Sequence, residues 1–357
     1  MAVAAGTAHE RTASLTIMAK KQIPVIVVAG FLGAGKTTLL NHLLRNTRGA
    51  RIGVIVNDFG SVNIDSMMVA GQVDSMVSLS NGCLCCAVDV SDMDAMLDKL
   101  AHRSSDLDVI VVEASGLAEP RNMIRLVAGS ENEYVSYGGL VLVVDAVEFD
   151  ATAAQHPELE QHVALADLVL INKTDRIDGD AHDDLLTRLC RLNSRAAVVS
   201  TDHGRIDPAL LFDIPERPDP QPGEQLTLDR LLYEQDDHEH THLHDGYDAI
   251  TFESSDALHP RVLVDFLENQ PAGVFRIKGY VRVAAGLDTG TYLLHTVGDH
   301  IRFEPAGRGD DVPDGTQLVV IGADLDSDDV RERLRRCVPT EPVSADAMYA
   351  IHRFTPR

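Results

Sequence analysis

The chain has 357 residues, of which 45% are apolar, and it carries a formal net charge of −24 at pH 7. This length and apolar content suffice for a full hydrophobic core and for two domains. The strong negative charge excludes nucleic acid and anionic membranes as main partners, because both favour basic surfaces. Apolar runs such as residues 140–144 are far shorter than a membrane-spanning helix requires.

Residues 1–21 lack the continuous apolar core of a secretory signal, and we predict that they form a disordered extension. The whole chain has five cysteines. Since no secretory signal precedes them, we expect reduced thiols and a cytoplasmic protein.

A series of short apolar runs organises the first part of the chain. Segments with helical periodicity separate them, an alternation typical of a doubly wound, mostly parallel α/β sheet. We therefore predict such a domain over residues 22–212, with ligands bound at the carboxyl ends of the strands. The predicted strands lie at residues 24–29, 52–56, 109–112, 140–144, 168–171 and 196–199.

The first of these runs leads directly into the sequence GFLGAGKTT, and a helical pattern follows. A buried strand, a GxxxxGKT loop and a helix in this order are typical of a phosphate-binding loop. The glycines let successive backbone N–H groups converge on phosphate oxygens at the positive end of the helix. Lys36 can reach the β and γ phosphates, and the Thr37 hydroxyl can bind Mg²⁺. The predicted nucleotide-binding residues of this loop are Gly30, Gly33, Ala34, Gly35, Lys36, Thr37 and Thr38.

Three of the five cysteines, Cys83, Cys85 and Cys86, fall within four positions of the sequence NGCLCC. Neighbours this close seldom meet disulfide geometry, and clustered thiolates are soft ligands that suit Zn²⁺ or Cu(I). A CxCC cluster supplies three donors of a tetrahedral set and leaves the fourth position to a carboxylate, a His, a water or a partner's ligand. We therefore predict a metal site with one open position, which suits transfer of the ion.

Acidic residues follow two of the predicted strands. Glu113 ends the run at 107–112, beside the phosphate loop, where a carboxylate that supports Mg²⁺ is expected. The sequence NKTD follows the run at 168–171, and its carboxylate can accept two parallel hydrogen bonds from the N1–H and amine of guanine. Adenine lacks this donor pair, so the pattern favours GTP over ATP. The predicted base-binding residues are Asn172, Lys173 and Asp175.

These motifs together resemble the CobW group of metallochaperone GTPases, which is related to the HypB and UreG proteins that load nickel into hydrogenase and urease. The resemblance runs from about Ile23 to about Val338. It rests on five ordered motifs, namely the phosphate loop, VNDFG at 56–60, NGCLCC at 81–86, EASGLAEP at 113–120 and NKTD at 172–175.

The resemblance implies that residues 57–65 form the first switch loop and that residues 113–116, including Gly116, form the second. It also implies that Glu113 stands where most GTPases have the Asp of DxxG. Lys36 and Glu113 are therefore the candidate catalytic residues. The group's Asn-Glu-Phe-Gly-Glu pattern reads NDFGS here, so one carboxylate is shorter and the other is missing. Asp58 or Asp65 remains as a candidate fourth ligand of the thiolate site.

A Pro-rich and then His-rich segment, residues 213–246, is predicted to be a linker. Alternating histidines flanked by acids can gather imidazoles around Zn, Ni, Co or Cu on either an extended chain or a helix. A solvated acidic linker that contains histidine only by composition is the alternative. The predicted ligands are His238, His240, His242 and His244.

A smaller C-terminal α+β domain is predicted over residues 247–340, followed by a tail at 341–357. The sequences RIKG and LVVIG within it are similar to the C-terminal domain of the CobW group. A client surface, a homodimer surface and a plain covering domain all fit this part. The expected strands and helices lie near 247–253, 273–282, 290–296 and 316–322, and near 260–269 and 328–336.

We predict a GTPase with slow intrinsic turnover that uses GTP and Mg²⁺ and delivers Zn²⁺ to a client metalloprotein. The thiolates lie between the two switch segments, so γ phosphate and metal are expected to act on connected backbone. One alternative is a Co²⁺ or iron chaperone for cobalamin synthesis or nitrile hydratase maturation. Another is a zinc buffer in which the nucleotide is structural.

Overall fold

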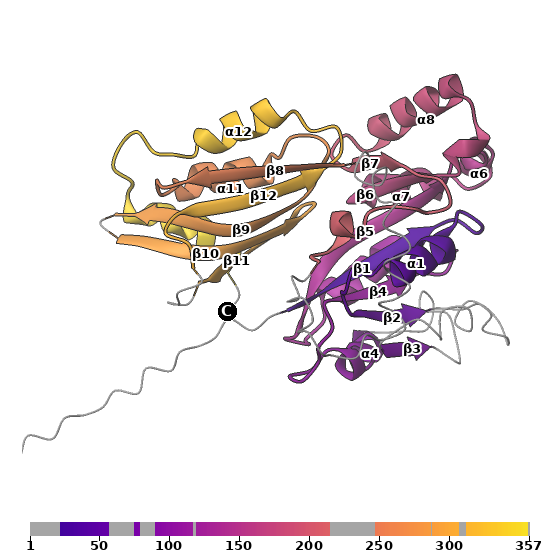
Figure 1. The fold of residues 1–357 in the computed structure, drawn as a ribbon, viewed down its shortest axis with the longest axis horizontal. Coiled ribbons are helices and arrows are strands. Elements are labelled where there is room, and N and C mark those ends of the chain that lie inside the picture. Colours follow the sequence, from indigo (N-terminus) through magenta and orange to yellow (C-terminus); the bar gives the residue numbers. More distant parts are fainter. Residues whose placement is uncertain are drawn as a thin grey trace, which may run out of the picture.

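The structure is a computed structural model, and it describes residues 22–56, 75–78, 90–116, 119–214, 247–286, 288–306 and 312–355. These residues form a seven-stranded sheet and a five-stranded sheet that lie side by side (Figure 1). None of the helices in these ranges is long and apolar enough to cross a membrane.

The seven-stranded sheet has the strand order β3-β2-β4-β1-β5-β6-β7. Every pairing between its described strands is parallel, and β1 lies between β4 and β5. All carboxyl ends therefore meet at one edge, where ligands bind in open sheets of this kind. The strands are β1 (Ile23–Gly30), β2 (Ile52–Val56), β3 (Ser75–Ser78), β4 (Val109–Glu113), β5 (Val135–Asp145), β6 (Leu168–Asn172) and β7 (Ala197–Ser200).

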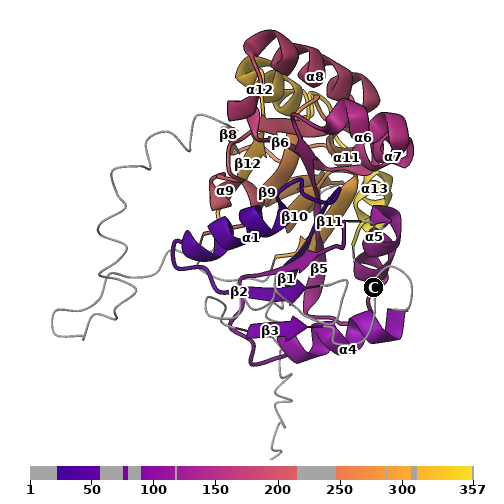
Figure 2. The same cartoon turned by 90° about the vertical axis from the view of Figure 1, so that its right-hand side faces the viewer.

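Alternate residues of β1 face two separate hydrophobic cores. Val25 and Val27 pack in the core under α4, α5, α6, α7 and α8, whereas Ile26 and Val28 pack in the core under α1 and α9. Figure 2 shows α1 and α9 on one side of the sheet and α4 and α5 on the other. Helices on both faces confirm the predicted doubly wound sheet. They are α1 (Lys36–Arg45), α4 (Val90–Leu100), α5 (Pro120–Ala128), α6 (Phe149–Gln155), α7 (Glu158–Leu165), α8 (Gly179–Leu192) and α9 (Pro208–Leu211).

The five-stranded sheet is antiparallel, in the order β11-β10-β9-β12-β8. Leu263, Leu334 and Ile351, from three different helices, are buried in a third core beneath it. This confirms a smaller α+β unit. Its elements are β8 (Asp248–Ser254), α11 (Pro260–Glu268), β9 (Val274–Ala285), β10 (Asp288–Val297), β11 (His300–Pro305), β12 (Thr316–Gly322), α12 (Ser327–Arg335), η3 (Ala345–Met348) and α13 (Tyr349–His352).

The two sheets share buried contacts. Phe275, Ile321 and Ala323 of the C-terminal unit pack in the same core as α1 and α9. The buried Arg276 donates hydrogen bonds to Asp213 Oδ1 at 2.9 Å and to the carbonyl of Ala209 at 2.8 Å. The two units therefore join through both an apolar and an ionic contact.

A partly buried carboxylate lies beside this junction. Oδ2 of Asp167 accepts hydrogen bonds from the Tyr137 hydroxyl at 2.6 Å and the Leu140 N–H at 2.8 Å. A Cβ atom added at Gly298 of the C-terminal unit would lie 1.8 Å from Asp167 Oδ1. Burial raises the pKa of Asp167 to about 6. In the native state this carboxyl therefore holds its proton to a higher pH than in the unfolded chain.

Asp167→Asn is expected to stabilise the protein more at pH 7.5 than at pH 5. A raised acid pKa means that stability falls as pH rises from the unfolded value towards about 6 and stays reduced above it. Asn removes the buried charge and keeps an acceptor for both donors. The gain is about 1–3 kcal/mol at pH 7.5, since each pKa unit corresponds to about 1.36 kcal/mol. Thermal melts at both pH values measure it, with the exposed Asp184→Asn as control. Equal gains at both pH values would contradict the assignment.

Candidate functional site

The phosphate loop joins β1 to α1 at the carboxyl edge of the sheet. Gly30, Gly33 and Gly35 have φ values of +146°, +80° and +110°, which L side chains rarely adopt. A Cβ atom at Gly30 would lie 2.4 Å from the Val143 carbonyl oxygen, and one at Gly35 would lie 2.2 Å from Asn172 Nδ2. Nothing lies within 4 Å of the same position at Gly33. Two glycines thus allow close packing against β5 and β6, while the loop stays open at the third.

Lys36 and Thr37 begin α1 and connect the loop to β4. The buried Lys36 ammonium donates to the carbonyls of Gly30 at 3.0 Å and Phe31 at 3.1 Å. The Thr37 hydroxyl donates to Glu113 Oε1 at 2.9 Å, and Glu113 is itself buried at the end of β4. The structure therefore brings the two candidate catalytic residues, Lys36 and Glu113, together at the carboxyl ends of the strands.

The segment that follows β4 packs against the phosphate loop. A Cβ atom at Gly116 would lie 2.9 Å from both the backbone N and the Cα of Leu32. Within the loop, the N–H of Ala34 donates to the carbonyl of Phe31 at 3.2 Å, and Thr38 is exposed in the first turn of α1. The predicted second switch segment thus ends in contact with the phosphate loop.

Asn172 and Lys173 lie against the same loop. Asn172 Nδ2 donates to the carbonyl of Ala34 at 2.8 Å, and its Oδ1 accepts from the N–H of Gly204 at 2.9 Å. Lys173 Nζ donates to the carbonyl of Gly33 at 2.9 Å. The predicted base-binding motif and the phosphate loop are therefore directly joined, although about 140 residues separate them in sequence.

Asp175 lies in the short helix η1 (Thr174–Arg176) and is exposed. The N–H and hydroxyl of Thr174 contact the carbonyl oxygen of Thr201 at 3.4 Å and 3.1 Å. This loop after β7 is part of the site, and the sequence analysis does not predict it. Its position at the end of an apolar run, with Gly204 soon after, is the signal that could have found it.

A second contributor absent from the predicted set is Asp145, the last residue of β5. Its Oδ2 lies 2.6 Å from Lys173 Nζ. An acidic residue at the end of an apolar run is also the pattern that selected Glu113. The same reasoning applied to the run at 140–144 would have found Asp145.

The described arrangement fits a nucleoside triphosphate with Mg²⁺. The first turn of α1 provides backbone N–H groups that have no partner within a helix, and anions bind at such ends. The Thr37 hydroxyl and the Glu113 carboxylate provide oxygen ligands of the kind that Mg²⁺ prefers. Phosphates and cation would therefore lie at the phosphate loop, and the base beside the NKTD motif.

Two segments whose own structure is not described follow β2 and β3. Val56 ends β2 and pairs with both Ser78, which ends β3, and Glu113. Both segments therefore leave the sheet at the edge that carries the phosphate loop. In the described ranges no group of three or more His, Cys, Asp or Glu side chains could hold a metal ion. The predicted metal ligands outside these ranges are Asp58 or Asp65, Cys83, Cys85, Cys86, His238, His240, His242 and His244.

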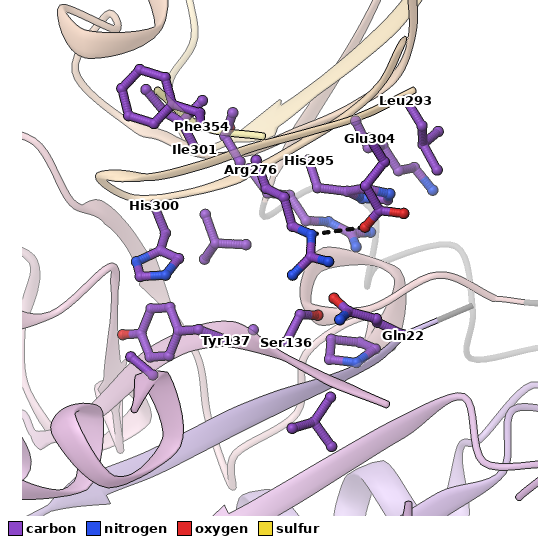
Figure 3. Close-up of a pocket in the computed structure, with 18 of the residues that line it drawn as sticks. Gln22, Ser136, Tyr137, Arg276, Leu293, His295, His300, Ile301, Glu304 and Phe354 are labelled. Atoms are coloured by element: carbon purple, nitrogen blue, oxygen red, sulfur yellow. Dashed lines mark hydrogen bonds and ion pairs between the residues drawn. The ribbon is translucent and has the colours of Figure 1, made fainter. Parts of the chain in front are cut away.

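A cavity of about 1200 Å³ lies elsewhere, between the amino ends of β1 and β5 and the C-terminal sheet (Figure 3). Gln22 and Tyr137 line one side of it, and Arg276 and His295 line the other. None of the predicted site residues lines this cavity. The candidate nucleotide site is therefore the loop-lined edge of the sheet rather than this cavity between the two units.

Comparison with known protein families gives two matches. Residues 24–200 match the family "CobW/HypB/UreG, nucleotide-binding domain". Residues 247–338 match "Cobalamin synthesis protein cobW C-terminal domain". The two matches follow the division of the chain into its two sheets.

Several characterised proteins are similar in sequence. The zinc chaperone CobW of Sinorhizobium is 30% identical over 356 residues, covering 89% of this chain and 98% of that protein. The zinc chaperone YjiA of Escherichia coli is 38% identical over 196 residues, which span 54% of this chain and only 61% of the relative. Among solved structures, the Zn(II)-bound YjiA GTPase from E. coli is similar with a TM-score of 0.41, 26% identity and coverage of 89% of this chain and 99% of that one.

Proposed function

The chain belongs to the CobW/HypB/UreG family of P-loop GTPases, and we propose that it binds Zn²⁺ at the thiolates of Cys83, Cys85 and Cys86 and passes it to a client metalloprotein. The predicted family and the predicted GTPase class are thereby confirmed. Relatives named zinc chaperones support zinc as the transferred ion. Because reduced thiolates are required, we also propose a cytoplasmic location.

The observation that carries this proposal is that the strands before both segments end on the same side of the sheet. The phosphate loop and Glu113 lie where β1 and β4 end, and the segment that contains the three cysteines begins where β3 ends on the same side. Ligands of parallel sheets gather at this edge. A segment that follows β3 at this end of the sheet can reach the nucleotide site, which supports a thiolate site near it. The histidines at 238–244 would serve as a weaker site that collects the ion.

Hydrolysis at the described site rests on positioning and on charge neutralisation, because phosphoryl transfer requires little covalent chemistry from the protein. When bound, Mg²⁺ supplies positive charge to the β and γ phosphates. Lys36 then exchanges the carbonyls of Gly30 and Phe31 for phosphate oxygens. Thr37 offers its hydroxyl to the ion, and Glu113 holds that hydroxyl in place. No general base stands among these residues, so we expect slow intrinsic turnover.

The proposal is tested by the zinc dependence of GTP hydrolysis. Stoichiometric Zn²⁺ is expected to change the GTPase rate of the wild type several-fold at constant Mg²⁺, and Cys83→Ala/Cys85→Ala/Cys86→Ala should abolish that response. Cys190→Ala, which removes an exposed thiol far along the chain, is the matched control and should respond as the wild type does. A wild type whose GTPase rate does not respond to zinc would instead favour a zinc buffer in which the nucleotide is structural. A triple variant that responds as the wild type does would place the responsive zinc site outside the three cysteines.

A further inference from the structure

Lys173 occupies a backbone conformation that its residue type rarely adopts. Its φ and ψ are 64° and 33°, in the left-handed region. Non-glycine residues stay there only when surrounding contacts hold them, and such positions gather at functional sites. The contacts that hold Lys173 should therefore matter for the nucleotide site.

The side chain of Lys173 spans two loops and ends on a carboxylate. Its ammonium donates to the Gly33 carbonyl at 2.9 Å and to Asp145 Oδ2 at 2.6 Å. The side chains of Lys173 and Asp145 are only 26% and 13% exposed. A half-buried, hydrogen-bonded ion pair of this kind is stronger than a pair on the open surface.

Asp145 is itself fixed by the turn that follows it. Its Oδ1 accepts from the N–H of Val147 at 3.0 Å, and the N–H of Ala146 donates to the carbonyl of Asn172 at 2.9 Å. One carboxylate oxygen thus anchors the residue to its own turn, while the other is directed to the ammonium. The turn therefore fixes the carboxylate in the orientation that binds the Lys173 ammonium.

We propose that Asp145 is a positioning residue for guanine nucleotides, acting through Lys173 to fix the NKTD motif against the phosphate loop. The inference rests on the proposed GTP site and extends it, since Asp145 touches Lys173 and not the nucleotide. Fixed spacing between the two loops lowers the ordering cost of binding a ligand that spans both. GDP and GTP share the portion that spans these loops, so Asp145 contributes equally to the affinity of both.

The test is a double-mutant cycle on the dissociation constant of labelled GDP. Asp145→Asn keeps the cap on the turn and removes the charge, and it is expected to weaken GDP and GTP about tenfold each, while kcat at saturating GTP stays within about twofold. Lys173→Met keeps the aliphatic stem without the ammonium. In that background Asp145→Asn should have no further effect, because its partner is gone. Asp145→Ser, which also retains an acceptor for the turn, provides a second variant.

Asp150→Asn is the matched control, because Asp150 lies just beyond the same turn, its side chain is 80% exposed, and it pairs with Arg188 of α8. It should leave both affinities unchanged. The same loss from Asp145→Asn with and without Lys173→Met would overturn the inference, since a purely structural role persists without the ammonium. Unchanged GDP affinity in Asp145→Asn would overturn it too. A wild type that binds neither nucleotide would overturn the proposed function together with this inference.

Discussion

Replacing Asp175 with Asn is expected to weaken GTP binding about 100-fold and to create binding of xanthosine triphosphate, as two charge-assisted hydrogen bonds of about 1.5 kcal/mol each are lost. The Asp175 carboxylate can accept from both N1–H and the amine of guanine. An Asn side chain offers one acceptor and one donor, and that donor can pair with the C2 carbonyl of xanthine. The neighbouring residues Asn172 and Lys173 bind the phosphate loop rather than Asp175, so the motif should keep its position in the variant.

The measurement is displacement of labelled GDP by GTP and by xanthosine triphosphate from wild type and Asp175→Asn. Asp180→Asn is the control, because Asp180 is an exposed acidic residue a few positions further on in the first turn of α8. It should retain the wild-type preference. If Asp175→Asn retains full GTP affinity and gains none for xanthosine triphosphate, then the base binds elsewhere.

Most of the sheet could be predicted from the sequence because its strands are buried on both faces. Such strands are continuous apolar runs, as in Val109–Glu113 and Leu168–Asn172. Two strands have weaker patterns. In β3 only Met76 and Val77 lie between serines. In β11 the buried Ile301 and Phe303 alternate with charged residues over six positions, which is typical of a short edge strand.

The local motifs of the candidate nucleotide site are visible in the sequence, because a phosphate loop needs fixed residue types at fixed spacing. What the sequence could not supply is which distant residues complete the site. Asp145 at the end of β5 and Thr201 just after β7 contact Lys173 and Thr174, which follow β6, and these three strands become neighbours only in the folded sheet. Likewise, nothing local to Asp167 predicts that Gly298 of the C-terminal unit will cover it. Contacts of this kind follow from topology rather than from pattern.

The largest effect expected beyond base recognition is on zinc affinity. The γ phosphate would lie beside Thr37 and Glu113, and Glu113 ends β4. Strand β4 pairs with β2, and β2 pairs with β3, the strand that precedes the cysteines. A rearrangement of the segments that follow these strands would therefore alter the spacing of the thiolates. Allosteric couplings of this type are typically about 5- to 150-fold. Linkage requires zinc to change the affinity for the GTP analogue, relative to GDP, by the same factor.

The most direct test is competition for Zn²⁺ against a chelating indicator, with the protein saturated by Mg²⁺ and either GDP or a non-hydrolysable GTP analogue. Cys83→Ala/Cys85→Ala/Cys86→Ala under the same conditions reports binding at any other site. We predict a zinc dissociation constant that differs at least about fivefold between the two nucleotides in the wild type and not in the triple variant. Equal zinc affinity with GDP and with the GTP analogue would contradict the coupling on which the proposed function depends.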